Sequence, residues 1–138
     1  MSIEITIQTA VKAPISVVWD SWTLENHIVN WNFASNEWCC PSAKNDLREN
    51  GDFSWRMEAK DGSMGFDFEG TYTKVDEHSF IEYALEDGRK VCILFEQKGD
   101  EVLVSETFTA EDQNTAEQQE AGWQAILNNF KLYTEGLD

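Results

Sequence analysis

Basic residues and cysteines are scarce in this chain of 138 residues, and each scarcity excludes a class of protein. Ten Lys and Arg stand against 26 Asp and Glu, and the formal charge of −16 would repel nucleic acid and anionic membrane surfaces. Cys39 and Cys40 are adjacent and Cys92 is alone, so no metal-ligand spacing occurs. We therefore expect reduced thiols, a cytoplasmic location and no metal site.

Long apolar runs and catalytic signatures are also missing. No stretch of 18 apolar residues occurs, and the N-terminus lacks a basic region followed by an apolar one, so we expect neither a membrane span nor a signal peptide. There is no nucleophile elbow and no glycine loop for phosphates, so we assign no catalytic residue and no cofactor. His27 and His78 are predicted at the surface, without a partner motif.

Aromatic residues, by contrast, are plentiful. Six Trp, eight Phe and three Tyr accompany a hydrophobic content of 41%, which is typical of a folded chain rather than a disordered one. The length suits one hydrophobic core. We expect a single domain over residues 1–138, with most of the rings in its core.

Most of the chain shows the period of β-strands. Residues 3–11 alternate between apolar and polar, which predicts a half-buried strand that Pro14 ends. Apolar residues at helical spacing then predict two short helices, the second with Thr23 as its N-cap. From Lys44 to Thr109, short alternating runs between turn residues predict an antiparallel meander.

A long helix is predicted at the C-terminus. It should begin near Asp112 or Thr115 and continue to about Glu135, with Gly136 as its stop. The fold class is therefore α+β, with a curved antiparallel sheet of six to seven strands, two short helices after the first strand, and the long helix across the concave face. The space between sheet and helix is either filled by side chains or retained as a pocket.

Three stretches resemble one known family. "VKAPISVVWDSWTLENHIVNW", "FEGTYTKVD" and "GWQAILNNFKLYTEGL" are similar to the activator of heat-shock protein 90 ATPase homologue-like family, within the START-like (SRPBCC), birch-pollen-allergen-like superfamily of helix-grip folds. The resemblance covers essentially the whole chain and implies a helix-grip fold. Folds of this kind host lipid carriers, cyclases, hydrolases and regulators of other proteins, so function must be argued from the site.

The concave face supplies the candidate site. Glu106 shares a strand face with Val104 and Phe108, so it either points toward the helix as an orienting or acid-base group, or a bulge returns it to water. Aromatic residues of the strands and the helix stripe are the other candidates. The predicted cavity-lining set is Trp55, Phe66, Phe68, Tyr72, Tyr83, Phe95, Glu106, Trp123, Ile126 and Phe130.

Three functions are compatible with this reading. The first is binding of an unidentified hydrophobic small molecule in the cavity. The second is a protein-interaction module, similar to a co-chaperone, that docks on a larger protein such as a chaperone. The third is an enzyme of the cyclase or hydrolase type acting on a hydrophobic substrate, with Glu106 or a tyrosine in acid-base work.

Overall fold

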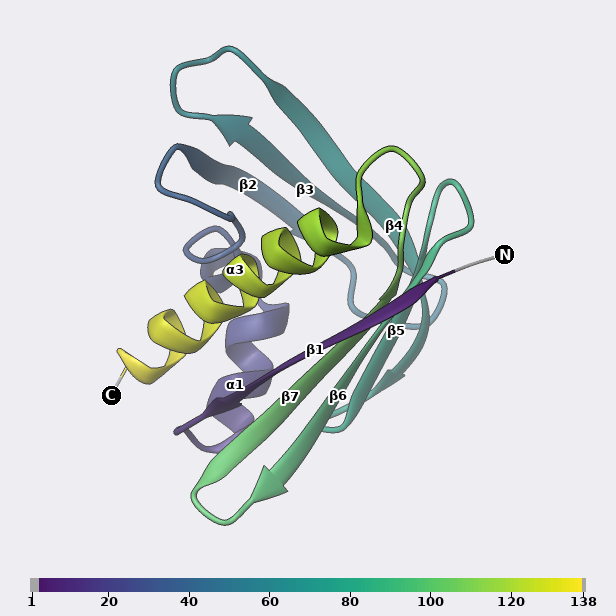
Figure 1. Ribbon diagram of the computed structural model, residues 1–138. Helices are drawn as coiled ribbons and strands as arrows, with labels where there is room; N and C mark the ends of the chain where they lie inside the picture. Colours follow the sequence, from purple (N-terminus) through teal and green to yellow (C-terminus); the bar gives the residue numbers. More distant parts are fainter. Residues whose placement is uncertain (1–2, 138) are drawn as a thin grey trace.

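The protein folds as one curved sheet gripping a long helix. The computed structural model describes residues 3–137. The elements are β1 (Glu4–Val11), α1 (Ile15–Thr23), α2 (Glu25–Ile28), β2 (Trp38–Asn45), β3 (Asp52–Ala59), β4 (Gly65–Asp76), β5 (Phe80–Leu85), β6 (Lys90–Lys98), β7 (Glu101–Thr109) and α3 (Ala116–Glu135). All seven strands pair antiparallel in the order β1-β7-β6-β5-β4-β3-β2, and α3 crosses the concave side (Figure 1). The predicted helix-grip arrangement is confirmed.

The strand β7 lies next to the edge strand β1, between β1 and β6. Its residues alternate strictly, with Val102, Val104, Glu106 and Phe108 buried and their neighbours partly exposed. The register sets Glu106 opposite Ile7 of β1 and Ile93 of β6 without a shift. Because successive side chains of a strand point to opposite faces, this regular pairing turns Glu106 inward.

The second short helix begins one residue later than predicted. Thr23 is the last residue of α1, and its hydroxyl donates to the Trp19 carbonyl at 2.8 Å instead of capping α2. Leu24, in an extended conformation, is the N-cap and offers no side-chain hydrogen bond. A hydroxyl that bonds back into the preceding turn cannot also cap the next helix, so the prediction for Thr23 is wrong.

The meander also begins earlier than the alternation in the sequence predicts. β2 starts at Trp38, whereas the predicted meander began at Lys44. This strand pairs with β3 alone, and its register shifts between Cys39 and Ser42, on either side of Pro41. Proline cannot donate to a ladder, and an irregular edge strand lacks the clean alternation of a central one.

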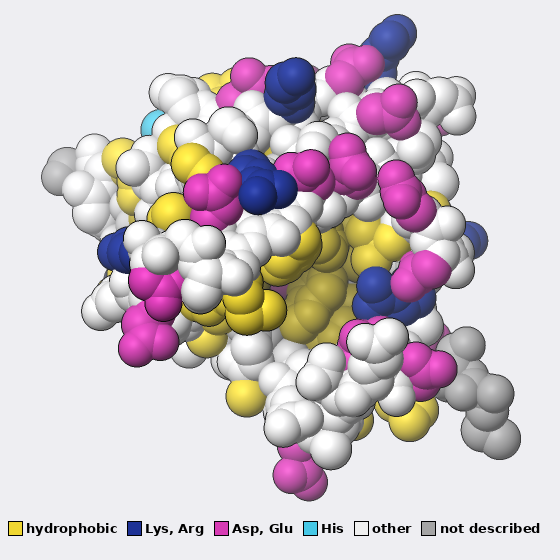
Figure 2. All heavy atoms as spheres, turned by 90° about the horizontal axis from the view of Figure 1, so that it is seen from above, with side chains coloured by type: hydrophobic (Ala, Val, Ile, Leu, Met, Phe, Trp, Pro, Cys, Tyr) yellow, Lys and Arg dark blue, Asp and Glu magenta, His cyan; other side chains and the backbone are white. Residues whose placement is uncertain are grey.

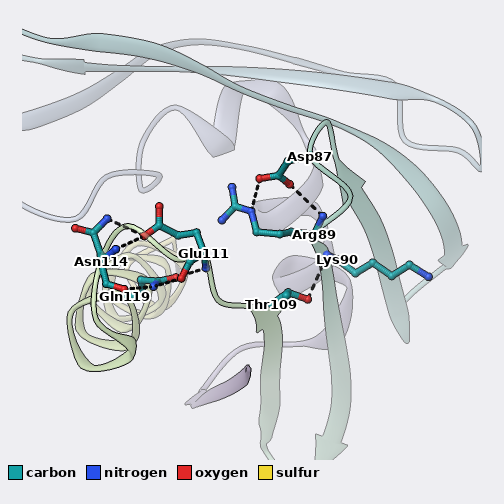
Figure 3. A network of polar contacts seen from close by, with 7 residues as sticks. All are labelled: Asp87, Arg89, Lys90, Thr109, Glu111, Asn114 and Gln119. Carbon is teal, nitrogen blue, oxygen red and sulfur yellow. Dashed lines mark hydrogen bonds and ion pairs between the residues drawn. The ribbon is translucent and has the colours of Figure 1, made fainter. Parts of the chain in front are cut away.

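The start of α3 is fixed by two sets of hydrogen bonds. Thr115 and Gln118 form a capping box, in which each side chain accepts from the backbone N–H of the other at 3.1 Å. The Gln119 side chain reaches back to both backbone groups of Glu111, accepting at 2.8 Å and donating at 3.1 Å, and Glu111 in turn accepts from Asn114 (Figure 3). These contacts fold the chain after β7 directly onto the helix.

Polar side chains of α3 hold the helix to the edge strand β1. The Lys131 ammonium donates to the Ala10 carbonyl at 2.6 Å, and the Gln124 amide donates to the Gln8 carbonyl at 3.3 Å. The apolar stripe of the helix therefore faces the hollow side of the sheet, with Leu127 and Phe130 fully buried.

Candidate functional site

A cavity of about 160 Å³ lies between α3 and the concave face of the sheet. Every layer of the fold contributes to its wall. The lining residues are Trp22 of α1, Trp31 and Asn32 after α2, Trp55 and Met57 of β3, Phe66 and Phe68 of β4, Tyr83 of β5, Glu106 of β7, and Trp123 and Ile126 of α3.

Stacked rings shape one side of the cavity. Phe68 lies nearly parallel to Trp55, with centroids 5.7 Å apart, and meets Trp123 edge-on at 6.1 Å. Trp123 lies flat on Phe108, which places the helix against β7. Aromatic pairs in these geometries are attractive beyond the area they bury, so the wall is well fixed.

The cavity continues into a shallower surface recess of about 240 Å³. Phe66 borders both spaces and is 48% exposed. It lies near the start of β4, whereas Tyr72, on the same face further along the strand, is buried. The face seen from above in Figure 2 is hollowed, with a hydrophobic floor. Residues shared by the two spaces are Met57, Phe66, Trp123 and Ile126. The two spaces therefore share an apolar border.

Glu106 is the ionisable acid of the cavity wall, and it is only 6% exposed. No residue in the described range 3–137 gives its carboxyl a hydrogen bond or an ion pair. Burial raises its pKa from 4.5 to about 8, because the charged form loses its water. The carboxyl is thus mostly protonated at neutral pH.

Tyr83 lies close to this carboxyl. Burial raises the pKa of Tyr83 well above 10, and the negative charge of ionised Glu106 raises it further. The tyrosine hydroxyl therefore stays protonated beside Glu106. Asn32 adds an amide to the same wall, and its Nδ2 has no hydrogen-bond partner among the described residues.

Seven of the ten residues predicted to line the cavity do so: Trp55, Phe66, Phe68, Tyr83, Glu106, Trp123 and Ile126. Of the two orientations that the sequence left open, the structure has the inward one for Glu106. Its regular pairing leaves no bulge that would return it to water.

Tyr72, Phe95 and Phe130 do not line the cavity, because each is used in packing elsewhere. Tyr72 donates its hydroxyl to Asn45, and burial raises its pKa. Phe95 meets the edges of Trp19 and Trp22 of α1, and Phe130 packs on Trp22 and Trp31.

Sequence reasoning missed Trp22, Trp31, Asn32 and Met57. Met57 shares a strand face with Trp55, and that alternation was a sufficient signal. The two tryptophans have helical spacing, but spacing alone does not show that they border an open space rather than packed atoms. No pattern in the sequence predicts that Asn32 lines the cavity. His27 was predicted at the surface, yet it is half-buried and its Nδ1 lies 2.5 Å from the Tyr133 hydroxyl.

No helix within residues 3–137 combines the length and the apolar character that a membrane crossing needs.

The element order and the helix across the hollow sheet define the protein as a START-like helix-grip domain. Residues 12–135 match the family described as Activator of Hsp90 ATPase homolog 1-like protein, and the chain belongs to this family.

Solved structures agree with this assignment. An AHSA1-like protein from Aeromonas hydrophila is 41% identical, with a TM-score of 0.91 over 97% of this chain and 93% of that one. A protein from Cytophaga hutchinsonii is 49% identical, with a TM-score of 0.84 over 96% and 92% of the two chains. A protein from Chromobacterium violaceum shares the fold at 18% identity, with a TM-score of 0.85 over 96% of each chain. No curated protein matches the sequence.

Proposed function

We propose that this protein binds a small, largely apolar molecule in the cavity under α3. The observation that carries the proposal is a partly enclosed space of about 160 Å³ with aromatic walls, bordered by an apolar surface recess. Side chains normally fill a core to crystal-like density, and a dry cavity of roughly 150 Å³ is large enough for a benzene molecule.

The size of the space limits the ligand. A single ring with a short substituent fits inside, and the adjoining recess of about 240 Å³ gives room for the rest of an elongated molecule. Ligand pockets for drug-sized molecules usually measure roughly 300 to 1,000 Å³, so a bulky polycyclic lipid would need the walls to move. The ligand-contact role of the seven lining residues predicted from sequence is part of this proposal.

A blocking substitution tests the function. Ile126→Trp adds a large side chain to a residue that borders both cavity and recess, and should abolish binding of ethylbenzene, followed by isothermal titration calorimetry. Leu132→Trp is the matched control, because Leu132 lies on the same helix and is 69% exposed. The control should bind like the parent. Equal binding by parent and Ile126→Trp, or no binding by the parent, contradicts the proposal.

The same variants address the other two functions. A docking module whose partner binds outside the recess would keep that partner in the Ile126→Trp variant, since the change is confined to the cavity and the recess. An enzyme would lose turnover in both Ile126→Trp and Glu106→Gln. We also propose a cytoplasmic location, which the free thiols of Cys39, Cys40 and Cys92 support.

A further inference from the structure

The polar groups of the cavity wall include the Glu106 carboxyl, the Tyr83 hydroxyl, the Asn32 amide and the Trp55 indole N–H. The Glu106 carboxyl belongs to the wall, and none of the described side chains pairs with it. Buried carboxylates are normally paired or hydrogen-bonded, because an isolated charge in an apolar space is costly. A group that enters the cavity and pairs with Glu106 would remove this cost.

The remaining wall is largely aromatic. Rings of Trp22, Trp31, Trp55, Phe68, Tyr83 and Trp123 surround the space, and their negative π-faces attract cations, most strongly for tryptophan. Among the lining residues there is no Lys, Arg or His. An anionic ligand would therefore meet Glu106 and the ring faces without any positive side chain to balance its charge.

The surroundings of the cavity also favour a cation over an anion. Arg89 borders the neighbouring hollow beside Phe66 and Phe68, but its guanidinium is paired with Asp87 at 2.6 Å (Figure 3). Arg56 is paired in the same way with Glu58 and Asp67. Asp and Glu side chains form a row beside the opening, with a Lys or Arg among them (Figure 2). The formal charge of −16 raises the local concentration of cations around the molecule.

We infer that the cavity binds a small organic cation, with its ammonium group against Glu106 and its carbon substituents on the indole faces. This inference rests on the proposed function and names its ligand class. It differs from the prediction of a purely hydrophobic ligand, because the charged group supplies an ion pair and cation–π contacts that a hydrocarbon cannot make.

Three ring compounds of similar size separate the ligand classes. Benzylammonium, ethylbenzene and benzoate are titrated by calorimetry into the parent protein at about pH 8, where about half of the Glu106 carboxyl is ionised. Benzylammonium should bind at least about tenfold more tightly than ethylbenzene, since each close cation–π contact contributes on the order of 1 kcal/mol and the ion pair adds to it. Benzoate should bind most weakly. Ethylbenzene binding as tightly as benzylammonium overturns the cation inference but leaves the proposed function standing. Failure of all three overturns both.

Glu106→Gln tests the role of the carboxyl. This variant should lose the preference for benzylammonium and keep the affinity for ethylbenzene, which shows that the cavity is still intact. Glu120→Gln is the charge-matched control, because Glu120 is exposed on α3 and its loss changes the net charge by the same amount. The control should keep the preference. Loss of the preference in both variants would assign it to net charge and overturn the ion pair with Glu106.

The pH dependence gives an independent test with tetramethylammonium, whose charge does not titrate. The groups around Glu106 are Ile7 of β1, Ile93 of β6, Tyr83 of β5 and the rings of β3, β4, α1 and α3. The Tyr83 hydroxyl stays protonated, so Glu106 is the group that titrates here. A cation prefers the ionised carboxylate, so affinity should rise about tenfold per pH unit below the pKa of Glu106 and level off near pH 8. Glu106→Gln should give a flat profile. A flat or falling profile in the parent overturns the inference.

Discussion

Trp123 of α3 lies flat on Phe108 of β7, with ring centroids 4.0 Å apart and planes inclined by 9°. Phe108 is two residues from Glu106 on the same inward face. The stacked pair therefore joins the helix to the strand that carries the buried carboxyl, and its Trp123 ring lines the cavity. Loss of the pair should affect both stability and ligand binding.

Replacement of Trp123 by Ala should lower the free energy of unfolding by about 3 kcal/mol, because large-to-small substitutions at aromatic core positions cost this much. Urea denaturation followed by circular dichroism measures the change. Leu132→Ala, at an exposed position of the same helix, should change stability by less than about 0.5 kcal/mol. Similar losses in both variants would contradict a stabilising role for the stacked pair.

The buried carboxyl of Glu106 predicts how stability depends on pH. Its pKa is about 8 in the folded protein and near 4.5 when unfolded, so between these values the unfolded chain binds fewer protons. Stability must then fall as pH rises through this window, by up to about 5 kcal/mol, and stay level above it. Urea denaturation of Glu106→Gln and the parent should give similar stabilities at about pH 4.5 and a growing advantage of the variant up to about pH 8. A constant difference across the window would contradict the buried, unpaired state of Glu106.

Gly70 and Gly122 predict opposite effects of the same substitution. A Cβ on Gly70 of β4 would lie 2.7 Å from the Ala84 carbonyl oxygen and 2.8 Å from the Phe53 ring, so Gly70→Ala should destabilise by roughly 2 kcal/mol. A Cβ on Gly122, inside α3, would have no atom within 4 Å. Gly122→Ala should therefore stabilise by about 0.5 to 1 kcal/mol through helix propensity. Thermal unfolding of the two variants and the parent measures both signs.

The capping box predicts a smaller effect at the start of α3. Thr115→Ala removes the hydroxyl that accepts from the Gln118 N–H, and should cost about 1 kcal/mol in urea denaturation. Thr115→Ser keeps the acceptor and should retain most of the stability. Equal losses in the two variants would show that the methyl group, rather than the cap, is responsible.

Local sequence patterns predicted most closely those elements whose residues follow a single pattern from end to end. β7 alternates without interruption, and α3 begins at a threonine cap and ends before Gly136, so both were predicted closely. Thr23 and Trp38 lie where two rules compete. The Thr23 hydroxyl has a carbonyl within reach in its own helix, and Trp38 starts an edge strand that Pro41 interrupts.

The site was predictable only in part, because a cavity is a property of the whole packing. Alternation correctly placed Glu106 and Trp55 on the concave face. It could not distinguish Phe130, which fills the space near Trp22, from Ile126, which borders an opening one helical turn away. That difference depends on where α1 and the segment after α2 lie against α3, and such long-range placement leaves no local signal in the sequence.

Both borders of the sheet are closed to further strands. On one side, α3 side chains occupy the carbonyls of Gln8 and Ala10, and on the other Pro41 breaks the ladder of β2. A second polypeptide would find no continuous row of backbone donors and acceptors on which to extend the sheet. The molecule can thus keep an open, apolar cavity at high concentration without polymerising through backbone hydrogen bonds.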